Sequence, residues 1–368
     1  MGALNGIRIV EFAGMGPTPF AAMWFAEHGA EVIRITRPGG GHVLGMKDDL
    51  LDRGRDWIEL DLKSPADRVI ARDLVLRADA VIEGLRPGAI ERLGLGPEDF
   101  ADHPRLVYGR MTGWGQTGPL AQRAGHDLTY LAISGALHTI GPADEPVPPL
   151  NLLGDFAGGS MYLVSGMLAA LLHAARTGQG QVVDAAIVDG VAHLMAMIAG
   201  MRLEGRWEDR REANVLDGAA PYYAVYHCAC GGHLAVGAIE DKFWAELLTH
   251  LEIAPDSLPD RFDRVNWPEI KARLAEVIAR RSRDDWAALM GDTDACAAPV
   301  LSIDEAPEHP HHRARGNFDG LAPQPAPRLS ATPAVIRPGC AVTAQEALAR
   351  WSRTGPAFGT APDPATAP

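Results

Sequence analysis

A histidine and an aspartate near the middle of the chain are the residues best suited to move a proton. His126 follows Gly125, and a glycine lets backbone and ligand approach an imidazole that titrates near neutral pH. Asp155 follows Gly154 and precedes a helix-forming run, where a carboxylate can do acid–base chemistry. Each residue also has an ordinary interpretation: Asp155 as a helix N-cap, and His126 as a hydrogen-bonded turn or core histidine.

Three basic residues fall at or just after the ends of predicted strands. These are Arg37, Lys63 and Arg86. Any one of them taken alone is best interpreted as a solvated surface cation. Three cations at equivalent positions of a sheet indicate a ligand that carries phosphate groups.

The elements that must position these residues alternate between strand and helix. Strands are predicted at 6–12, 30–35, 57–64 (with a turn at its end), 78–83, 106–109 and 181–188, and helices at 20–28, 65–77, 160–176 and 189–203. Such alternation predicts an α/β fold with a doubly wound parallel sheet, in which ligands gather at the carboxyl ends of the strands. After a polar boundary at 204–217, a hairpin at 222–237 and helices at 268–280 and 284–290 predict a second, smaller α+β domain.

Composition narrows the class of protein. Among 368 residues, 47 Asp and Glu outnumber 34 Lys and Arg, so the net charge of −13 disfavours nucleic acid and anionic membranes as partners. Four irregularly spaced cysteines fit a reducing compartment. The N-terminus lacks a signal-peptide pattern and no apolar run reaches the ~20 residues of a membrane span, so we expect a cytoplasmic protein. The segment 227–233 (HCACGGH) fits a hairpin turn better than a metal site, and we expect no metal.

The order of the motifs resembles that of the family III CoA-transferases, over roughly residues 3 to 300. The matching segments are GMGP at 14–17, RP at 37–38, LDLK at 60–63, EGLRPG at 83–88, RLGLGP at 92–97, MTGWGQTGP at 111–119, GHD at 125–127, PPLNLLGD at 148–155 and GAIE at 237–240. Within this family the chain is most similar to the racemases of 2-methylacyl-CoA thioesters. A match of many short motifs in order is far more specific than any one of them.

The resemblance implies an interlocked homodimer, in which a Rossmann-like large domain at 1–205 is completed by about 306–350 and joined to a small domain at 218–305. The tail at 355–368 is Pro/Ala-rich, and we expect it to be disordered. His126 and Asp155 would be the acid–base pair, with Glu240 of the partner subunit assisting His126. The CoA moiety would contact Arg37, Leu60, Asp61, Leu62, Lys63, Gly84, Leu85, Arg86, Arg92, Gly125, His126, Asp127, Leu128, Thr129 and Tyr130.

The implied reaction interconverts (R)- and (S)-2-methylacyl-CoA by 1,1-proton transfer through an enolate, with no cofactor because CoA belongs to the substrate. One group must be basic and the other protonated, which requires the pKa of Asp155 to be raised. Backbone amides after Gly154 are expected to stabilise the enolate oxygen. The alternatives are a CoA-transferase with Asp155 as covalent nucleophile and, less favoured, a non-catalytic acyl-CoA-binding protein. The sequence does not identify the acyl chain of the substrate.

Overall fold

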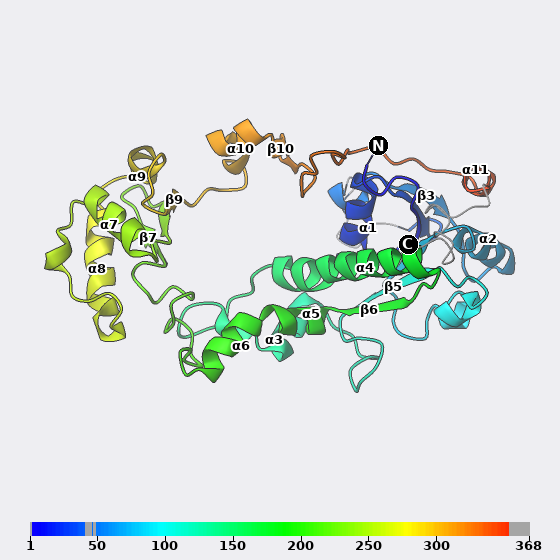
Figure 1. The fold of residues 1–368 in the computed structure, drawn as a ribbon, viewed down its shortest axis with the longest axis horizontal. Helices are drawn as coiled ribbons and strands as arrows, with labels where there is room; N and C mark the ends of the chain where they lie inside the picture. Colours follow the sequence, from blue (N-terminus) through cyan, green and yellow to red (C-terminus); the bar gives the residue numbers. More distant parts are fainter. Residues whose placement is uncertain (1, 41–45, 47–48, 353–368) are drawn as a thin grey trace, which may run out of the picture. The chain divides into compact units, whose positions relative to one another are not determined.

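The structure is a computed structural model that describes residues 2–40, 46 and 49–352 (Figure 1). The chain divides into two compact units, which are described separately. The first comprises residues 1–135, 149–195 and 322–368, and the second 136–148 and 196–321. The tail predicted at 355–368 lies outside the described residues. The predicted domain bounds of 1–205 with 306–350, and of 218–305, stay predictions.

A six-stranded parallel sheet organises the first unit and confirms the predicted α/β fold. Its strand order is β3-β2-β1-β4-β5-β6, which is the Rossmann order, with the reversal point between β1 and β4. In this register Val10 of β1 pairs with Ile33 of β2 and Val81 of β4. The strands are β1 Arg8–Phe12, β2 Glu31–Thr36, β3 Asp56–Glu59, β4 Ala80–Glu83, β5 Val107–Thr112 and β6 Val182–Ala186.

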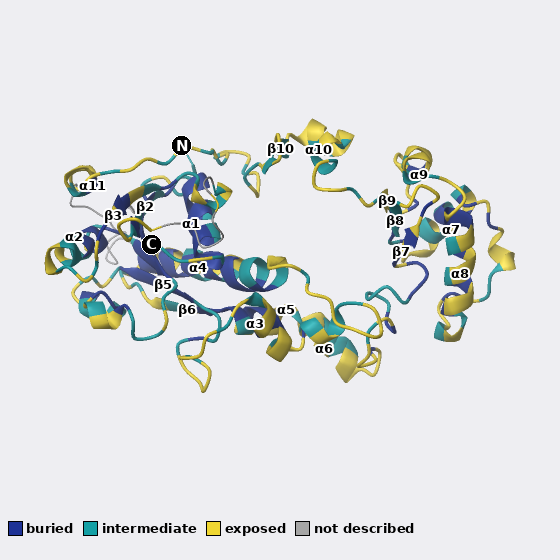
Figure 2. Cartoon of the chain, turned by 180° about the vertical axis from the view of Figure 1, so that it is seen from behind, coloured by how far each residue is buried: buried dark blue, intermediate teal, exposed yellow. Residues whose placement is uncertain are grey.

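Helices cover this sheet and bury its apolar residues (Figure 2). They are α1 Pro17–Glu27, α2 Pro65–Val75, α3 Asp127–Ser134, α4 Met161–Thr177, α5 Ile187–Leu194 and α11 Ala344–Arg350, and a short strand β11 spans Ala322–Pro323. Helix α1 begins three residues before the predicted start, because Pro17 and Pro19 fit a first helical turn that needs no amide donors. Leu74, Val75 and Trp351 pack with Val10 and Phe12 in one buried cluster.

One helix is longer than its sequence pattern suggested. Residues Leu152–Thr177 form a continuous 26-residue helix that is long and apolar enough to cross a membrane by length and composition. The expectation that no such apolar stretch exists is therefore wrong. Core helices pass the same test, and α4 buries one face, including Leu163, Met167 and Leu171.

The helix predicted at 189–203 is two helices in the structure. Helix α5 ends at Leu194, and α6 begins at Ala196 and ends at Leu203. Residue 195 is a methionine, and neither glycine nor proline marks the break, so the sequence gives no sign that one helix ends there and another begins. The division of the chain into units also falls at this residue.

The second unit contains a three-stranded antiparallel sheet, and the predicted hairpin is confirmed as β7 and β8. Its elements are β7 Ala224–His227, β8 His233–Val236, β9 Ala297–Pro299, α6 Ala196–Leu203, α7 Asp241–His250, α8 Trp267–Ile278, α9 Arg283–Met290, α10 Pro310–Arg315 and β10 Phe318–Asp319. The buried core includes Leu234, Leu247, Leu274 and Trp286.

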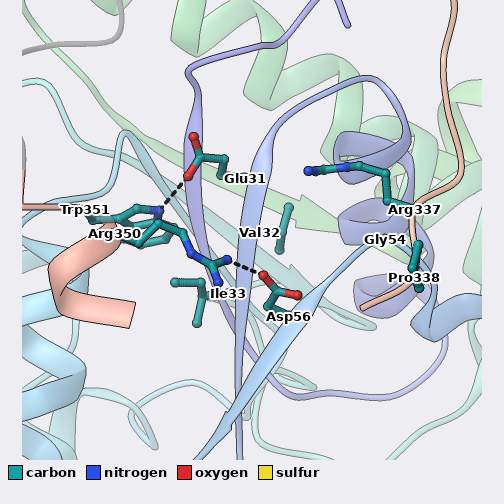
Figure 3. Close-up of a pocket in the computed structure, with 9 residues that line it drawn as sticks. All are labelled: Glu31, Val32, Ile33, Gly54, Asp56, Arg337, Pro338, Arg350 and Trp351. Carbon is teal, nitrogen blue, oxygen red and sulfur yellow. Dashed lines mark hydrogen bonds and ion pairs between the residues drawn. The ribbon is translucent and has the colours of Figure 1, made fainter. Parts of the chain in front are cut away.

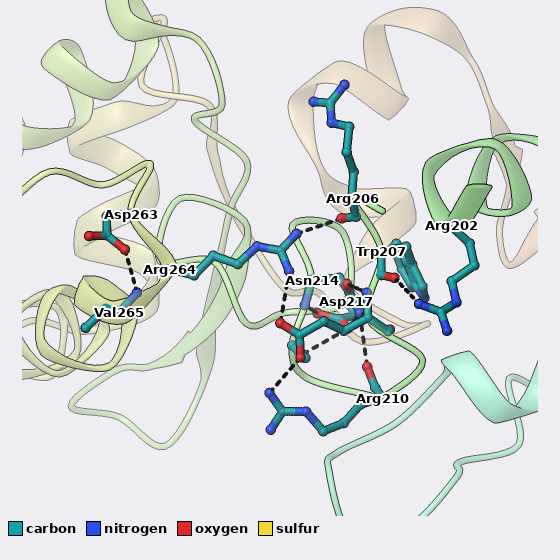
Figure 4. Close-up of polar contacts among 11 residues, drawn as sticks. Arg202, Arg206, Trp207, Arg210, Asn214, Asp217, Asp263, Arg264 and Val265 are labelled. Atoms are coloured by element: carbon teal, nitrogen blue, oxygen red, sulfur yellow. Dashed lines mark hydrogen bonds and ion pairs between the residues drawn. The ribbon is translucent and has the colours of Figure 1, made fainter. Parts of the chain in front are cut away.

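A buried asparagine fixes the chain between α6 and β7 (Figure 4). The Asn214 side chain donates to the backbone oxygens of Glu208 and Arg210 and to the Asp217 carboxylate, and accepts from the Glu208 amide. Arg264 joins this hydrogen-bond network through an ion pair, with its Nη1 3.2 Å from Glu208 Oε1. Because all the polar groups of Asn214 are satisfied, this segment keeps one conformation without regular secondary structure.

Candidate active site

Asp155 lies inside a π-helical segment that leads into α4. The segment spans Leu152–Ser160, and the amide of Phe156 donates to the Asn151 oxygen five residues back, at 3.3 Å. Asp155 caps no helix, so its ordinary interpretation as an N-cap is wrong. Single π-turns in proteins are often found at functional sites, since the wider turn redirects a side chain.

The carboxylate of Asp127 holds this π-helical segment in place. Its Oδ1 accepts the amide of Asp155 at 2.7 Å. Residue 154 must be glycine, because a Cβ there would lie 2.1 Å from the same Oδ1. Asp127 is the first residue of α3, so its carboxylate links the start of that helix directly to the segment that carries Asp155.

The surroundings of Asp155 raise its pKa to about 6. Burial has the largest effect, and the charge of Asp127 raises the pKa further. A hydrogen bond from Asn151, at 3.4 Å, and the charge of His126 act in the opposite direction. Gly16, in the loop after β1, has a φ of +60°, and a Cβ on it would lie 3.0 Å from Asp155 Oδ2. The site therefore sits beside the carboxyl end of β1, where the strand order reverses.

His126 immediately precedes α3 and presents an exposed imidazole. Its amide donates to Thr129 Oγ1 at 3.0 Å, and Thr129 Oγ1 donates to the His126 oxygen at 2.7 Å, so the backbone there is fixed. Within 2–40, 46 and 49–352 the imidazole has no hydrogen-bond partner. It is therefore not the satisfied turn or core histidine of the alternative interpretation. Its charge acts on Asp155, so the structure brings the two predicted acid–base residues together.

The amides expected to stabilise an enolate are already engaged. Those of Asp155 and Phe156 donate to Asp127 and Asn151. This expectation is wrong because Asp127 and Asn151 already accept the hydrogen bonds of these two amides. In contrast, the amides of Asp127 and Leu128, at the N-terminus of α3, have no acceptor among the described residues. They are placed beside His126, at the positive end of the helix.

The predicted CoA-contacting residues gather at the carboxyl ends of three strands and at the start of α3. Arg37 follows β2, 60–63 follow β3, and 84–86 follow β4. Arg92 lies in a 3₁₀ turn, Glu91–Leu93, and 125–130 include the first turn of α3. Burial and the nearby carboxylates raise the pKa of Tyr130 to about 12, while the charge of Arg86 acts in the opposite direction, so Arg86 lies near Tyr130.

Glu240, the third predicted catalytic residue, belongs to the second unit. Glu240 is exposed and precedes α7 in the second unit, where its charge acts on the Cys296 thiol, whose pKa is raised chiefly by burial. The roles of Gly16, Asn151 and Asp127 toward Asp155 were missed by sequence reasoning. The sequence spacing could have identified Asn151, because it lies four residues before Asp155 and residues four apart face each other on a helix.

A separate cavity of about 290 Å³ lies at the amino ends of β2 and β3 (Figure 3). It is lined by the first residues of β2 and β3, Glu31 and Asp56, and by the end of α11. The Trp351 indole donates to Glu31 at 3.0 Å, and Arg350 pairs with Asp56. These two contacts attach the end of α11 to the first residues of β2 and β3.

Known proteins are similar to this chain over most of its length. The family model for CoA-transferase family III matches residues 4–360. The alpha-methylacyl-CoA racemases of Mus musculus and Homo sapiens are 43% and 42% identical, each over 90% of this chain and 88% of their own length. The crystal structure of a CAIB/BAIF family protein from Brucella suis superposes with a TM-score of 0.79 at 25% identity, covering 95% of this chain and 99% of its own. The chain belongs to CoA-transferase family III.

Proposed function

We propose that this protein is a 2-methylacyl-CoA racemase, an isomerase that interconverts the (R) and (S) thioesters. The observation that carries the proposal is an aspartic acid with a pKa near 6 beside an exposed histidine. The racemase relatives, at more than 40% identity over most of the chain, support the same activity.

The reaction needs one base and one acid on opposite sides of the α-carbon. Neutral His126 takes the α-proton of one epimer, and the electrons of the broken C–H bond move onto the thioester oxygen as an enolate. Protonated Asp155 then returns a proton to the other face, and the reverse reaction exchanges the two roles. With a pKa of about 6, roughly a tenth of Asp155 is protonated at pH 7 in the free enzyme.

The enolate oxygen is stabilised by the amides of Asp127 and Leu128, which are unpaired within the described part of the chain. Donors that point at a developing charge lower the barrier most when they need no reorganisation. The basic residues at the strand ends bind the CoA phosphates. Since both proton carriers are side chains, the reaction needs no metal and no cofactor beyond the CoA of the substrate.

The proposal includes a homodimer in which Glu240 of the partner subunit assists His126. Helix α6 supports it, because its sequence AMIAGMRL is apolar although none of its residues is buried within the single chain. Met197 and Leu203 are more than half exposed. We propose that a second copy of the chain covers this apolar helix. The four sparse cysteines support a cytoplasmic location, which is part of the proposal.

Exchange of the α-proton tests this function. One epimer of a 2-methylacyl-CoA is incubated in deuterated water without an acceptor acid, and the α-hydrogen is followed by NMR. Loss of the α-hydrogen signal with appearance of the other epimer is expected. A CoA-transferase would instead need an acceptor acid and would form a hydroxylamine-sensitive adduct on Asp155. Such an adduct without exchange would replace the racemase proposal.

Substitution of either proton carrier should nearly abolish epimerisation. His126→Ala and Asp155→Ala each remove one of the two groups, and such groups typically contribute about 10²–10⁴-fold to the rate. Neither side chain is required to hold the CoA phosphates, so calorimetry should show CoA binding close to that of the wild type. Epimerisation at the wild-type rate in either variant would remove that residue from the mechanism.

A further inference from the structure

A buried arginine lies behind the loop predicted to contact CoA. Arg110 of β5 is 7% exposed, and Glu83, its register neighbour at the end of β4, is fully buried. Arg110 Nε donates to Glu83 Oε1 at 2.8 Å. The other oxygen of the same carboxylate accepts the amide of Leu85 at 2.7 Å. The start of the loop is thereby connected to the interior of the sheet.

The same guanidinium also holds the far end of this loop. Its Nη2 lies 2.7 Å from Glu91 Oε1, at ion-pair distance although not aligned as a hydrogen bond. Glu91 immediately precedes Arg92. Residues 84–92 carry four predicted CoA contacts: Gly84, Leu85, Arg86 and Arg92. Arg110 therefore fixes both ends of one short segment without reaching its outer face.

The charges around Arg110 affect how the loop binds an anionic ligand. Glu83 and Glu91 place one carboxylate at each end of the loop, and Arg110 neutralises one of these charges. Without the guanidinium, Glu83 would be a buried carboxylate with no cation, and the loop would have an uncompensated negative charge at both ends. Such a loop would be both less ordered and more repulsive toward phosphates.

We propose that Arg110, through Glu83 and Glu91, positions the 84–92 loop for the phosphates of acyl-CoA and so sets KM without taking part in proton transfer. This inference rests on the proposed function, because it takes a CoA thioester as substrate. Arg110 is a positioning residue, since it touches the loop and not the ligand. Its effect should depend on the nucleotide half of the substrate.

The test compares two thioesters of the same 2-methylacyl group, one on CoA and one on pantetheine, which lacks the nucleotide phosphates. Glu91→Gln breaks the more exposed contact and leaves Glu83 paired, so this variant should fold. We expect KM for the CoA thioester to rise roughly five-fold, with kcat unchanged, while KM for the pantetheine thioester stays constant. Glu98→Gln, an exposed carboxylate in the next 3₁₀ turn, is the matched control and should change neither value.

Arg110→Lys provides the second variant, because lysine keeps the charge but cannot contact both carboxylates at once. Its KM should rise for the CoA thioester only. An equal rise with both thioesters, or a fall in kcat at constant KM, would overturn the positioning role. Calorimetry with CoA separates the two proposals. A wild type that binds no CoA defeats the proposed function, whereas equal Kd values in wild type and both variants defeat only the role of Arg110.

Discussion

At the scale of single residues, Asp127 acts on the site in two ways. Its carboxylate fixes the backbone of Asp155 through a hydrogen bond of 2.7 Å, and its charge helps to raise the pKa of Asp155 to about 6. The raised pKa lets a carboxyl group hold a proton close to physiological pH. Asp127 thus fixes the position of the proposed acid and adds to the effect of burial on its proton affinity.

Asp127→Asn should separate these two effects. Asparagine retains an oxygen that can accept the Asp155 amide but removes the negative charge, so the pKa of Asp155 should fall. The limb of the kcat/KM profile that reports the ionisation of Asp155 should therefore move to lower pH, by about one unit.

The two directions of the reaction must show the same displacement, because the equilibrium constant fixes the ratio of their kcat/KM values at every pH. Asp102→Asn, a change at an exposed aspartate outside the site, should leave the profile where it is. An Asp127→Asn profile that coincides with the wild type would mean that the charge of Asp127 does not reach the proton carriers.

His126 and Asp155 could be chosen from the sequence because their types and neighbouring glycines are local features. The raised pKa of Asp155 was expected from the chemistry, but its cause could not be identified from the sequence, since it depends on burial and on Asp127, which lies 28 residues away. The position of Glu83 was visible as part of a motif, but its partner Arg110 belongs to another strand. Pairing between strands is a property of the register, which a single sequence does not state.

At the scale of elements, the π-helical segment Leu152–Ser160 is what the sequence reasoning missed. Alternating apolar strands and helices predicted the parallel sheet, because each element had a clear period. A π-turn has no such period, and its glycines at 154, 158 and 159 resemble an ordinary loop. The break at Met195 was missed for a related reason, since no breaker residue accompanies it.

Gly154→Ala should disable the π-helical segment. The new Cβ would lie 2.1 Å from Asp127 Oδ1, so the carboxylate must move and release the Asp155 amide. A shift of about 1 Å at a catalytic group commonly costs about 10²-fold in rate, and we expect kcat to fall by that order. Steady-state kinetics of the purified variant, with circular dichroism to verify folding, measures the effect.

A double-mutant cycle tests the cause of that loss. In an Asp127→Ala background the carboxylate is gone, so Gly154→Ala should have little further effect on kcat. If the two losses simply multiply, the alanine acts through some other contact of the π-helical segment.

At the scale of the whole molecule, the proposed acid–base pair and Glu240 lie in different units of the chain. The first unit contains the pair, the strand ends and the 84–92 loop, while the second carries Glu240 at the start of α7. In the proposed homodimer, each site takes Glu240 from the other subunit. This arrangement makes the dimer necessary for full activity and not only for stability.

Mixing two defective subunits tests this arrangement. His126→Ala and Glu240→Ala are each expected to be impaired alone, and the two are co-expressed with different tags so that heterodimers can be isolated. If Glu240 acts across the interface, one site of each heterodimer combines both substitutions, and the other site is intact. A random mixture, half of which is heterodimer, should then regain about a quarter of wild-type activity, and the purified heterodimer about half. If Glu240 serves His126 of its own subunit, every site keeps one defect and mixing restores nothing.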